Sequence, residues 1–344
     1  MKTKIGLFIG LLFLSFCFLC WVSAPIAEFY ATRCYPFVSM VLSRVGALVP
    51  FSLEEIVVLG FVVAFICILV KAVRSRKGFA FWFKRTAVLL MWLFVWFYMG
   101  WGNNYHRMGL YARYGIQKVS FEAERFKLFL ENYSRNLNNA AGMTGSLGNR
   151  EALEAEIRGF YFHNVTPYGY TSLHHWQKPK RPILNRLFSA VLVHGFMGPF
   201  FCEAQVNTEL LEYEYPFTVA HEMAHLVGVT SEAEASWWGF ACCRESSNPY
   251  VRYSGYLAIL PYVLSNARGL LHEDEYIAWT ETLCQKAKED YMKSREYWKG
   301  TRVGWIDRTQ SWFYNLYLRS NGVSEGIKDY YGVVSMIITM DELR

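Results

Sequence analysis

The sequence predicts a mainly helical protein, with N-terminal transmembrane helices followed by an α+β domain that contains a small sheet. Three observations lead to this fold class. The chain is 53% hydrophobic, more than an average soluble domain, and the excess concentrates before residue 102. Residues 102–344 have the length of one ordinary domain. Within them, the stretch TVAHEMAHLVGVTSEAEASWWGFACC combines helical spacing with two histidines and three glutamates.

Three apolar runs precede residue 102, and each is long enough to be predicted as a membrane-spanning helix, because a bilayer core of about 30 Å needs roughly 20 helical residues. They cover about residues 5–23, 53–73 and 82–101. Ser52 and Glu55 have the spacing of a capping box, which marks the start of the second helix. The first run could instead be a signal peptide cleaved after Ala24, but Pro25 directly after that site favours a retained helix.

The distribution of lysine and arginine predicts how these helices are oriented. The connection between the second and third runs carries six basic residues, whereas the loop before the second run has two. The six are Lys71, Arg74, Arg76, Lys77, Lys84 and Arg85. Basic loops stay in the cytoplasm, so we expect a multi-pass protein of the cell membrane whose residues 102–344 are extracytoplasmic. The lipid bilayer is then a partner, and the net charge of +6 does not indicate nucleic acid.

The first half of the external domain gives weaker local signals. Residues 121–138 have the spacing of a helix with mixed charge, followed by a connector rich in small residues. Residues 187–193 and 203–208 are predicted to form two short strands around the turn HGFMGP. Four cysteines lie in this external part, where a disulfide is permitted, and their pairing is left open. They are Cys202, Cys242, Cys243 and Cys284.

The most informative segment runs from Pro216 to Gly228 and is predicted to form one helix, because proline suits its first turn and glycine its end. His221 and His225 are one turn apart, so both imidazoles project from one face, as two metal ligands require. Glu222 lies beside the first histidine, where it can reach a water at the metal without binding the metal itself. The alternative is a helix with two histidines in purely structural roles.

Two glutamates on the following helix compete to be the third ligand. Ser231 and Glu234 have capping-box spacing, which gives Glu234 a structural role at the helix start. Glu232 and Glu234 point about 200° apart around a helix, so both cannot face one metal ion. Small residues follow on the face of Glu232, and we therefore predict Glu232 as the ligand, with Glu234 as the alternative. Ser236, one turn further on, is placed to hydrogen-bond a ligand histidine.

This pattern resembles the gluzincin metallopeptidases, in which HExxH is followed by a helix that reads ExxA, although Ser236 stands where that group commonly has Asp or Asn. Most of the chain also resembles a bacterial membrane family of unknown function, DUF3810. The matching stretches are WGNNYHR, EAQVN, PFTVAHEMAHLVG, YSGYL and YLRSNGVSEG. The resemblance implies N-terminal membrane helices (residues 1–101) followed by a zincin-like domain (102–344) with an HExxH active-site helix.

Three protein ligands leave one coordination position open, which is the pattern of catalytic zinc, so we expect one Zn²⁺ per chain. Glu222 would act as the general base that accepts a proton from the attacking water and passes it to the leaving amine. Tyr253 and Arg252 are the candidate donors to the oxyanion. The strand with Glu203, Gln205 and Asn207 is a candidate edge strand for pairing with an extended substrate; a plain sheet edge is the alternative reading.

These expectations favour a membrane-anchored zinc metallopeptidase that hydrolyses peptide bonds of a peptide or protein at the outer face of the cytoplasmic membrane. Two alternatives remain at this stage. The first is a non-catalytic membrane protein whose fold is stabilised by zinc and which serves as an interaction module. The second is a hydrolase that acts on cell-wall amide bonds.

The charge distribution gives a direct test of orientation. A reporter fused after Arg344 should be active outside the cytoplasm, and a reporter fused near Lys77 should be active inside, because the dense basic cluster is retained in the cytoplasm. Cytoplasmic activity of the Arg344 fusion would overturn the predicted localisation.

Overall fold

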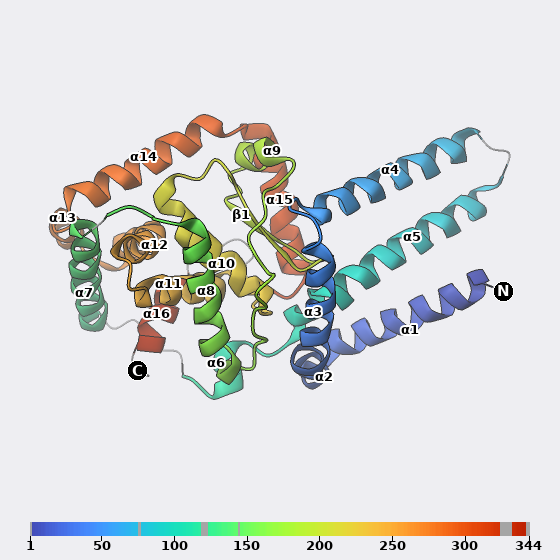
Figure 1. Ribbon diagram of the computed structural model, residues 1–344, viewed down its shortest axis with the longest axis horizontal. Coiled ribbons are helices and arrows are strands. Elements are labelled where there is room, and N and C mark those ends of the chain that lie inside the picture. Colours follow the sequence, from blue (N-terminus) through green and yellow to red (C-terminus); the bar gives the residue numbers. More distant parts are fainter. Residues whose placement is uncertain (1, 75–76, 118–122, 144, 324–331, 342–344) are drawn as a thin grey trace.

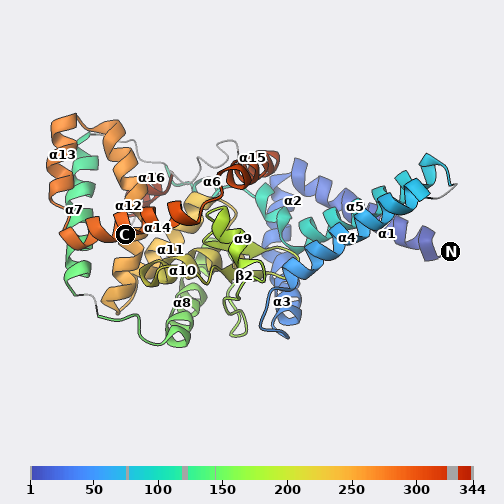
Figure 2. The ribbon, with the colours of Figure 1, turned by 90° about the horizontal axis from the view of Figure 1, so that it is seen from above.

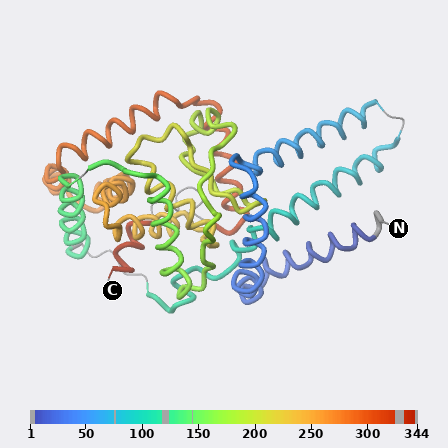
Figure 3. The backbone as a smooth tube through the Cα atoms, in the orientation of Figure 1, coloured from blue at the N-terminus to red at the C-terminus, as the bar shows by residue number. Residues whose placement is uncertain are grey.

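The structure is a computed structural model that describes residues 2–74, 77–117, 123–143, 145–323 and 332–341. Three long helices project as an arm from a larger body (Figure 1). The body is mainly helical and contains one two-stranded sheet among the described residues. Figure 3 follows the chain from the tip of the arm into the body, where the last described helix lies.

The arm consists of α1 (Lys2–Val22), α4 (Leu53–Arg74) and α5 (Phe79–Gly100). These helices coincide with the three predicted apolar runs, and each is long and apolar enough to cross a membrane. The first turn of α1 lies at the free end of the arm, the same end as the last turn of α4 and the first turn of α5 (Figure 1). The opposite ends of all three helices meet the body, an arrangement consistent with membrane association.

The segment between α1 and α4 packs on the body rather than in the arm. It forms α2 (Ala24–Phe29), a short π-helix (Tyr30–Cys34) and α3 (Tyr35–Gly46). The buried hydroxyl of Tyr35 donates a hydrogen bond to the carbonyl of Leu226 at 2.7 Å, and Glu28 forms an ion pair with Arg107. Residue 101 therefore marks the end of the last arm helix, while residues 24–46 contribute to the packing of the body.

A buried glutamate joins the start of α4 to the sheet. Glu203 accepts hydrogen bonds from the backbone N–H groups of Leu53 and Glu54, at 3.1 and 3.2 Å, and from Nζ of Lys180 at 2.6 Å. The first N–H groups of a helix have no partner within the helix, so an acceptor from elsewhere must satisfy them. A negative charge at this helix end is also favoured by the helix dipole.

Two further carboxylates point from α4 back into the body. Glu54 accepts a hydrogen bond from the backbone N–H of Phe200 at 2.9 Å. Glu55 accepts from the N–H groups of Ile183 and Leu184, at 2.6 and 3.1 Å. The hydroxyl of Ser52 caps the helix through the N–H of Glu55, as the sequence predicts, but the side chain of Glu55 reaches outward to the neighbouring segment.

The sheet consists of β1 (Gly195–Gly198) and β2 (Glu203–Val206), which pair antiparallel. The second predicted strand is confirmed, but the first is wrong. Residues 187–193 contain the end of α9 (Asn185–Ala190) and a turn with Leu192 at φ 58°. A short apolar run has no periodicity that separates a strand from a helix, and the segment predicted as a turn is the strand.

The rest of the chain is mainly helical, as predicted. Before the sheet lie a 3₁₀ segment (Gly102–His106), α6 (Leu110–Tyr114), α7 (Ala123–Gly142), α8 (Arg150–Asn164) and a second 3₁₀ turn (Thr166–Tyr168). After it come a 3₁₀ turn (Glu212–Glu214), α10 (Tyr215–Leu226), α11 (Glu232–Glu245), α12 (Pro249–Leu270), α13 (Glu273–Glu281), α14 (Gln285–Thr301), α15 (Gly304–Ser320) and α16 (Val333–Asp341). Of the helix predicted at 121–138, the first two residues lie outside the described ones, and α7 covers the rest and extends to Gly142.

All eight cysteines lie within the described residues and are free thiols. The pairing of Cys202 with Cys242 or Cys243, which the sequence left open, is therefore not formed in this structure. Cys202, Cys242 and Cys243 are buried, and burial raises the pKa of the Cys202 thiol to about 12.

α10 and α11 form the centre of the body, with α12 packed against both (Figure 2). Gly239 of α11 faces α10 so closely that a Cβ atom there would lie 3.2 Å from the backbone nitrogen of His221 and 3.3 Å from its Cα. The glycine thus sets the spacing of the two helices. Gly159 of α8, in contrast, has no atom within 4 Å of such a Cβ.

Replacing each glycine by alanine tests this spacing. Gly239→Ala should destabilise the protein by about 1–3 kcal/mol, because the added methyl group meets backbone that cannot move freely. Gly159→Ala is the matched control and should stabilise by up to about 1 kcal/mol, the difference in helix propensity. Thermal unfolding of both variants in detergent, followed by tryptophan fluorescence, measures the effect. An unchanged or raised melting temperature for Gly239→Ala would contradict the close approach.

Candidate metal centre

The site lies where α10 ends and α11 begins. Gly228 follows α10 with φ at +100°, a conformation that favours glycine, and turns the chain. Ser231 is the N-cap of α11, and its hydroxyl accepts a hydrogen bond from the N–H of Glu234 at 3.3 Å. The turn is short, so Glu232, the first residue of α11, returns to the last two turns of α10.

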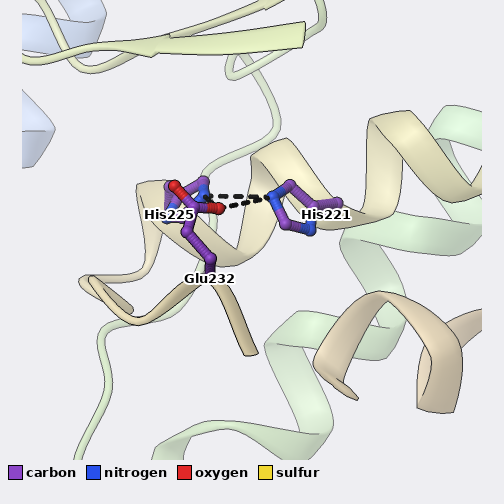
Figure 4. Close-up of side chains that lie close together, drawn as sticks. All are labelled: His221, His225 and Glu232. Atoms are coloured by element: carbon purple, nitrogen blue, oxygen red, sulfur yellow. Dashed lines mark hydrogen bonds and ion pairs between the residues drawn. The ribbon is translucent and has the colours of Figure 1, made fainter. Parts of the chain in front are cut away.

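Three side chains meet at this point (Figure 4). Nε2 of His221 lies 3.2 Å from Oε2 of Glu232 and 3.2 Å from Nε2 of His225, and the second histidine is 3.4 Å from the same oxygen. The three residues are only 8%, 5% and 6% exposed, in the order His221, Glu232, His225. Their donor atoms all lie within 4.8 Å of one another, so a single metal ion fits among them. The structure thus brings together the three residues that the sequence predicts as ligands.

The outer atoms of the same side chains are held by further hydrogen bonds. Nδ1 of His225 bonds the carbonyl of Val229 at 2.8 Å, and Nδ1 of His221 lies 3.3 Å from the hydroxyl of Ser236, as predicted. A carbonyl only accepts, so Nδ1 of His225 carries a proton, and Nε2 is the nitrogen that faces His221 and Glu232 and can bind a metal once it is unprotonated. Such outer bonds fix the tautomer and the orientation of metal-binding histidines.

Glu232 has a second partner that comes from far along the chain. The hydroxyl of Tyr314, on α15, donates to Oε1 of Glu232 at 2.5 Å, while Oε2 faces the two histidines. One carboxylate oxygen of Glu232 thus accepts from Tyr314, and the other faces the point where the three side chains meet. The sequence offers no spacing signal for this contact, because the two residues are 82 positions apart.

The electrostatics of the three residues favour a cation at their centre. Burial raises the pKa of the Glu232 carboxyl, but the charge of His225 and the bonds from both histidines outweigh it and hold that pKa well below its usual value. Burial lowers the pKa of His225, yet Glu232 raises it to about 9. The pKa of His221 is lowered by burial. A buried carboxylate and two imidazoles form the nitrogen and oxygen donor set that suits zinc.

Glu222 lies next to the three residues but is not one of the converging donors. Its side chain faces β1, since a Cβ atom on Gly195 would come within 2.5 Å of Oε1 of Glu222. Burial raises the pKa of the Glu222 carboxyl to about 8. The position therefore holds an acid that can exchange a proton near neutral pH, between the metal ligands and the strand.

Glu234, the alternative ligand, points elsewhere. Its carboxylate accepts hydrogen bonds from the hydroxyl of Tyr170 and from Nε1 of Trp238, the latter at 3.3 Å. Burial raises the pKa of Glu234. The two glutamates thus diverge around α11 as the helical spacing predicts, and the carboxylate of Glu234 binds core side chains.

The two predicted oxyanion donors, both on α12, form hydrogen bonds with groups outside the three ligands. The hydroxyl of Tyr253 donates to Asp290 on α14 at 2.7 Å. Arg252 donates to the carbonyls of Ser246 and Ser247, which follow the far end of α11. The sequence does not show where these two side chains point relative to the HExxH helix. In the structure both form hydrogen bonds that stabilise the packing of the body.

The predicted edge strand is wrong in one respect, because β2 has neighbours on both sides. The backbone N–H of Lys180 donates to the carbonyl of Ala204 at 2.8 Å, and its carbonyl accepts from the N–H of Val206 at 2.9 Å. The backbone groups of Ala204 and Val206 are therefore directed away from β1. The alternate residues Glu203, Gln205 and Asn207 therefore pair with β1. Their side chains are buried, and those of Glu203 and Asn207 form structural hydrogen bonds, whereas the amide of Gln205 has no hydrogen-bond partner within the described part of the chain. β2 is thus the inner strand.

β1 is the edge of the sheet among the described residues. Phe196 and Gly198 pair with β2, which leaves the backbone groups of Gly195 and Met197 directed away from β2. Gly195 is also the residue that lies against Glu222. An extended chain bound to β1 would therefore lie next to the acid and the three ligands.

Comparison with known proteins identifies a family. The chain matches the family described as "Protein of unknown function (DUF3810)" over residues 30–338. The matched stretch includes α4, α5 and every residue of the site described above. No curated protein and no solved structure matches the chain.

The divergence of the two glutamates gives a test of the ligand set. Glu232→Gln should lower zinc affinity by more than about 100-fold, because an anionic ligand is exchanged for a neutral one. This effect is larger than that of removing a group that only hydrogen-bonds a ligand. Glu234→Gln should retain about one zinc per chain, since the amide oxygen can still accept from Tyr170. Zinc content after dialysis of the purified full-length protein measures both. Loss of zinc in Glu234→Gln with retention in Glu232→Gln would reverse the assignment.

Proposed function

We propose that this chain, which belongs to the DUF3810 family, is a membrane-anchored zinc-dependent metallopeptidase with a zincin-like body. One observation carries the proposal: a buried acid, Glu222, lies between three converging metal donors and the free edge of a strand. A peptidase needs a metal, a base and a surface that aligns an extended substrate, and these three elements are adjacent here.

The residues that would hold zinc are His221, His225 and Glu232. Three protein ligands leave a fourth position open, which is typical of catalytic rather than structural zinc. When bound, zinc would polarise the substrate carbonyl and lower the pKa of water. The hydrogen bonds from Nδ1 of His221 to Ser236, from Nδ1 of His225 to Val229 and from Tyr314 to Glu232 would orient the ligands before any metal arrives.

Glu222 is the residue that moves protons in this proposal. Its raised pKa, caused by burial, allows it to hold a proton near neutral pH as well as to release one. It accepts a proton as a water molecule attacks the peptide carbonyl. It then delivers that proton to the departing amine nitrogen, and the carboxylate is restored for the next cycle.

The substrate would bind as an extended segment along β1. The outward N–H and C=O groups of Gly195 and Met197 can pair with a peptide backbone, a mode that recognises the main chain and leaves side chains to neighbouring pockets. A side chain at position 195 would collide with Glu222, so glycine keeps the strand and the acid close together. This geometry favours a peptide or protein over other amides.

The site would act at the outer face of the cytoplasmic membrane. Lys71 and Arg74 lie in the last turn of α4, and Lys84 and Arg85 lie near the start of α5, all toward the free tip of the arm. Basic residues favour the cytoplasmic side, so the body at the other end of the arm would be extracytoplasmic.

Glu222→Gln separates the proposal from a purely structural zinc site. The variant should keep its zinc but lose peptide hydrolysis by about 100-fold or more, because the attacking water lacks its base. Glu245→Gln makes the same chemical change at an exposed position at the end of α11, and should leave both properties unchanged. The full-length protein in nanodiscs, incubated with a peptide library, gives the readout. Equal cleavage by wild type and Glu222→Gln would refute the peptidase proposal and favour a zinc clamp between α10 and α11.

A further inference from the structure

α15 carries a stripe of large apolar side chains that the body does not cover. Trp305, Trp312, Phe313 and Leu316 are 68%, 61%, 59% and 52% exposed. At 100° per residue they occupy a sector of about 100° around the helix, so they form one continuous face. Water-soluble surfaces rarely carry so many large apolar side chains side by side without a partner.

Two exposed arginines border this stripe. Arg308 and Arg319 lie on the same side of the helix as Trp312, within about 40° of it. A helix with tryptophan, phenylalanine and leucine on one face and arginine beside them is typical of helices that lie in the interface of a membrane with anionic lipids. Tryptophan is also enriched at the depth of the lipid headgroups.

The end of α15 lies at the level where the arm meets the body. The ring of Tyr317 packs against Phe97 in the last turn of α5, with centroids 5.9 Å apart. The hydroxyl of Tyr98 donates to Asn321 at 2.8 Å. α15 runs across the direction of α1, α4 and α5, next to the base of the arm (Figures 1 and 2). If the arm crosses a bilayer, α15 lies along its surface.

A second exposed apolar segment lies at the same level. Ile183, Leu184 and Leu187 are exposed, and the backbone of the first two is bonded to Glu55 in the first turn of α4. The carbonyl of Ala190 in the adjoining helix α9 accepts from Val303, the residue before α15. A backbone hydrogen bond thus joins the segment before α15 to α9, and the exposed apolar residues that lead into α9 lie next to the start of α4.

The opposite side of α15 reaches the candidate metal centre. Tyr314 lies about 180° around the helix from Trp305, and its hydroxyl donates to Glu232. One short helix thus has a lipid-compatible face on one side and a bond to a metal ligand on the other.

We propose that α15 lies in the headgroup layer of the bilayer that the arm crosses, with Trp305, Trp312 and Phe313 inserted among the lipids, and that this contact holds Tyr314 against Glu232. The inference rests on the membrane placement of the proposed function, but it does not depend on hydrolysis. A lipid surface is favoured over a second copy of the chain because the end of α15 packs on α5 at the base of the arm and because arginines border the stripe.

Lipid contact can be measured by photocrosslinking of the full-length protein in nanodiscs of phosphatidylcholine and phosphatidylglycerol. p-Benzoylphenylalanine in place of Trp312 should yield lipid adducts in mass spectrometry. The same group in place of Leu128, which is 58% exposed on α7 at the far side of the body, is the control and should yield few. Equal lipid labelling at both positions, or a crosslinked dimer from position 312, would overturn the proposal.

The link to the metal centre has its own measurement. The double variant Trp305→Glu, Trp312→Glu should lower zinc affinity in nanodiscs about 10-fold, because Glu232 would lose its hydrogen bond from Tyr314. The loss should shrink in a Tyr314→Phe background, because both changes act through one hydroxyl. Additive losses would refute the link. Wild-type protein that binds no zinc while position 312 labels lipid would refute the proposed metal site and retain the membrane contact.

Discussion

The burial of the Glu232 carboxylate is the constraint on which the arrangement of the body depends. A carboxylate with 5% exposure must be compensated by positive charge and hydrogen bonds, or it would become neutral. The histidines of α10 and the hydroxyl of Tyr314 on α15 provide this compensation. The turn before α11 makes Glu232 the first residue of that helix and so directs its side chain to these groups. Gly239 brings α10 close enough for these groups to meet.

α10 is in turn fixed by donors that arrive from outside the centre of the body. Indole Nε1 of Trp101, at the end of the arm, donates to the carbonyl of His225 at 2.9 Å, and Tyr35 donates to that of Leu226. The last carbonyls of a helix have no partner within it, so these buried donors satisfy groups that would otherwise destabilise the fold. The arm and the candidate metal centre therefore share hydrogen bonds and form one structural unit.

The sequence predicted the parts of the protein that local rules determine. The arm follows from apolar composition, and the meeting of His221, His225 and Glu232 follows from helical spacing, a glycine and an N-cap serine. The predictions that failed depended on neighbours far along the chain. Lys180 makes β2 an inner strand, and Asp290 engages Tyr253. For the same reason the sequence shows no sign of the bond from Tyr314 to Glu232, across 82 positions. The strand at 187–193 failed because a short apolar run has no periodicity that separates strand from helix.

The carboxylates at the start of α4 have a consequence for how the protein is made. Glu55 and Glu54 are synthesised 128 and 146 residues before their backbone partners Ile183 and Phe200. Until the sheet region has been synthesised, both acids lack these partners and are exposed to water. Only then can the start of α4 be buried, so the packing of the arm on the body is completed by folding of the body. A chain truncated before the sheet would leave two carboxylates without their backbone partners in the first turn of α4.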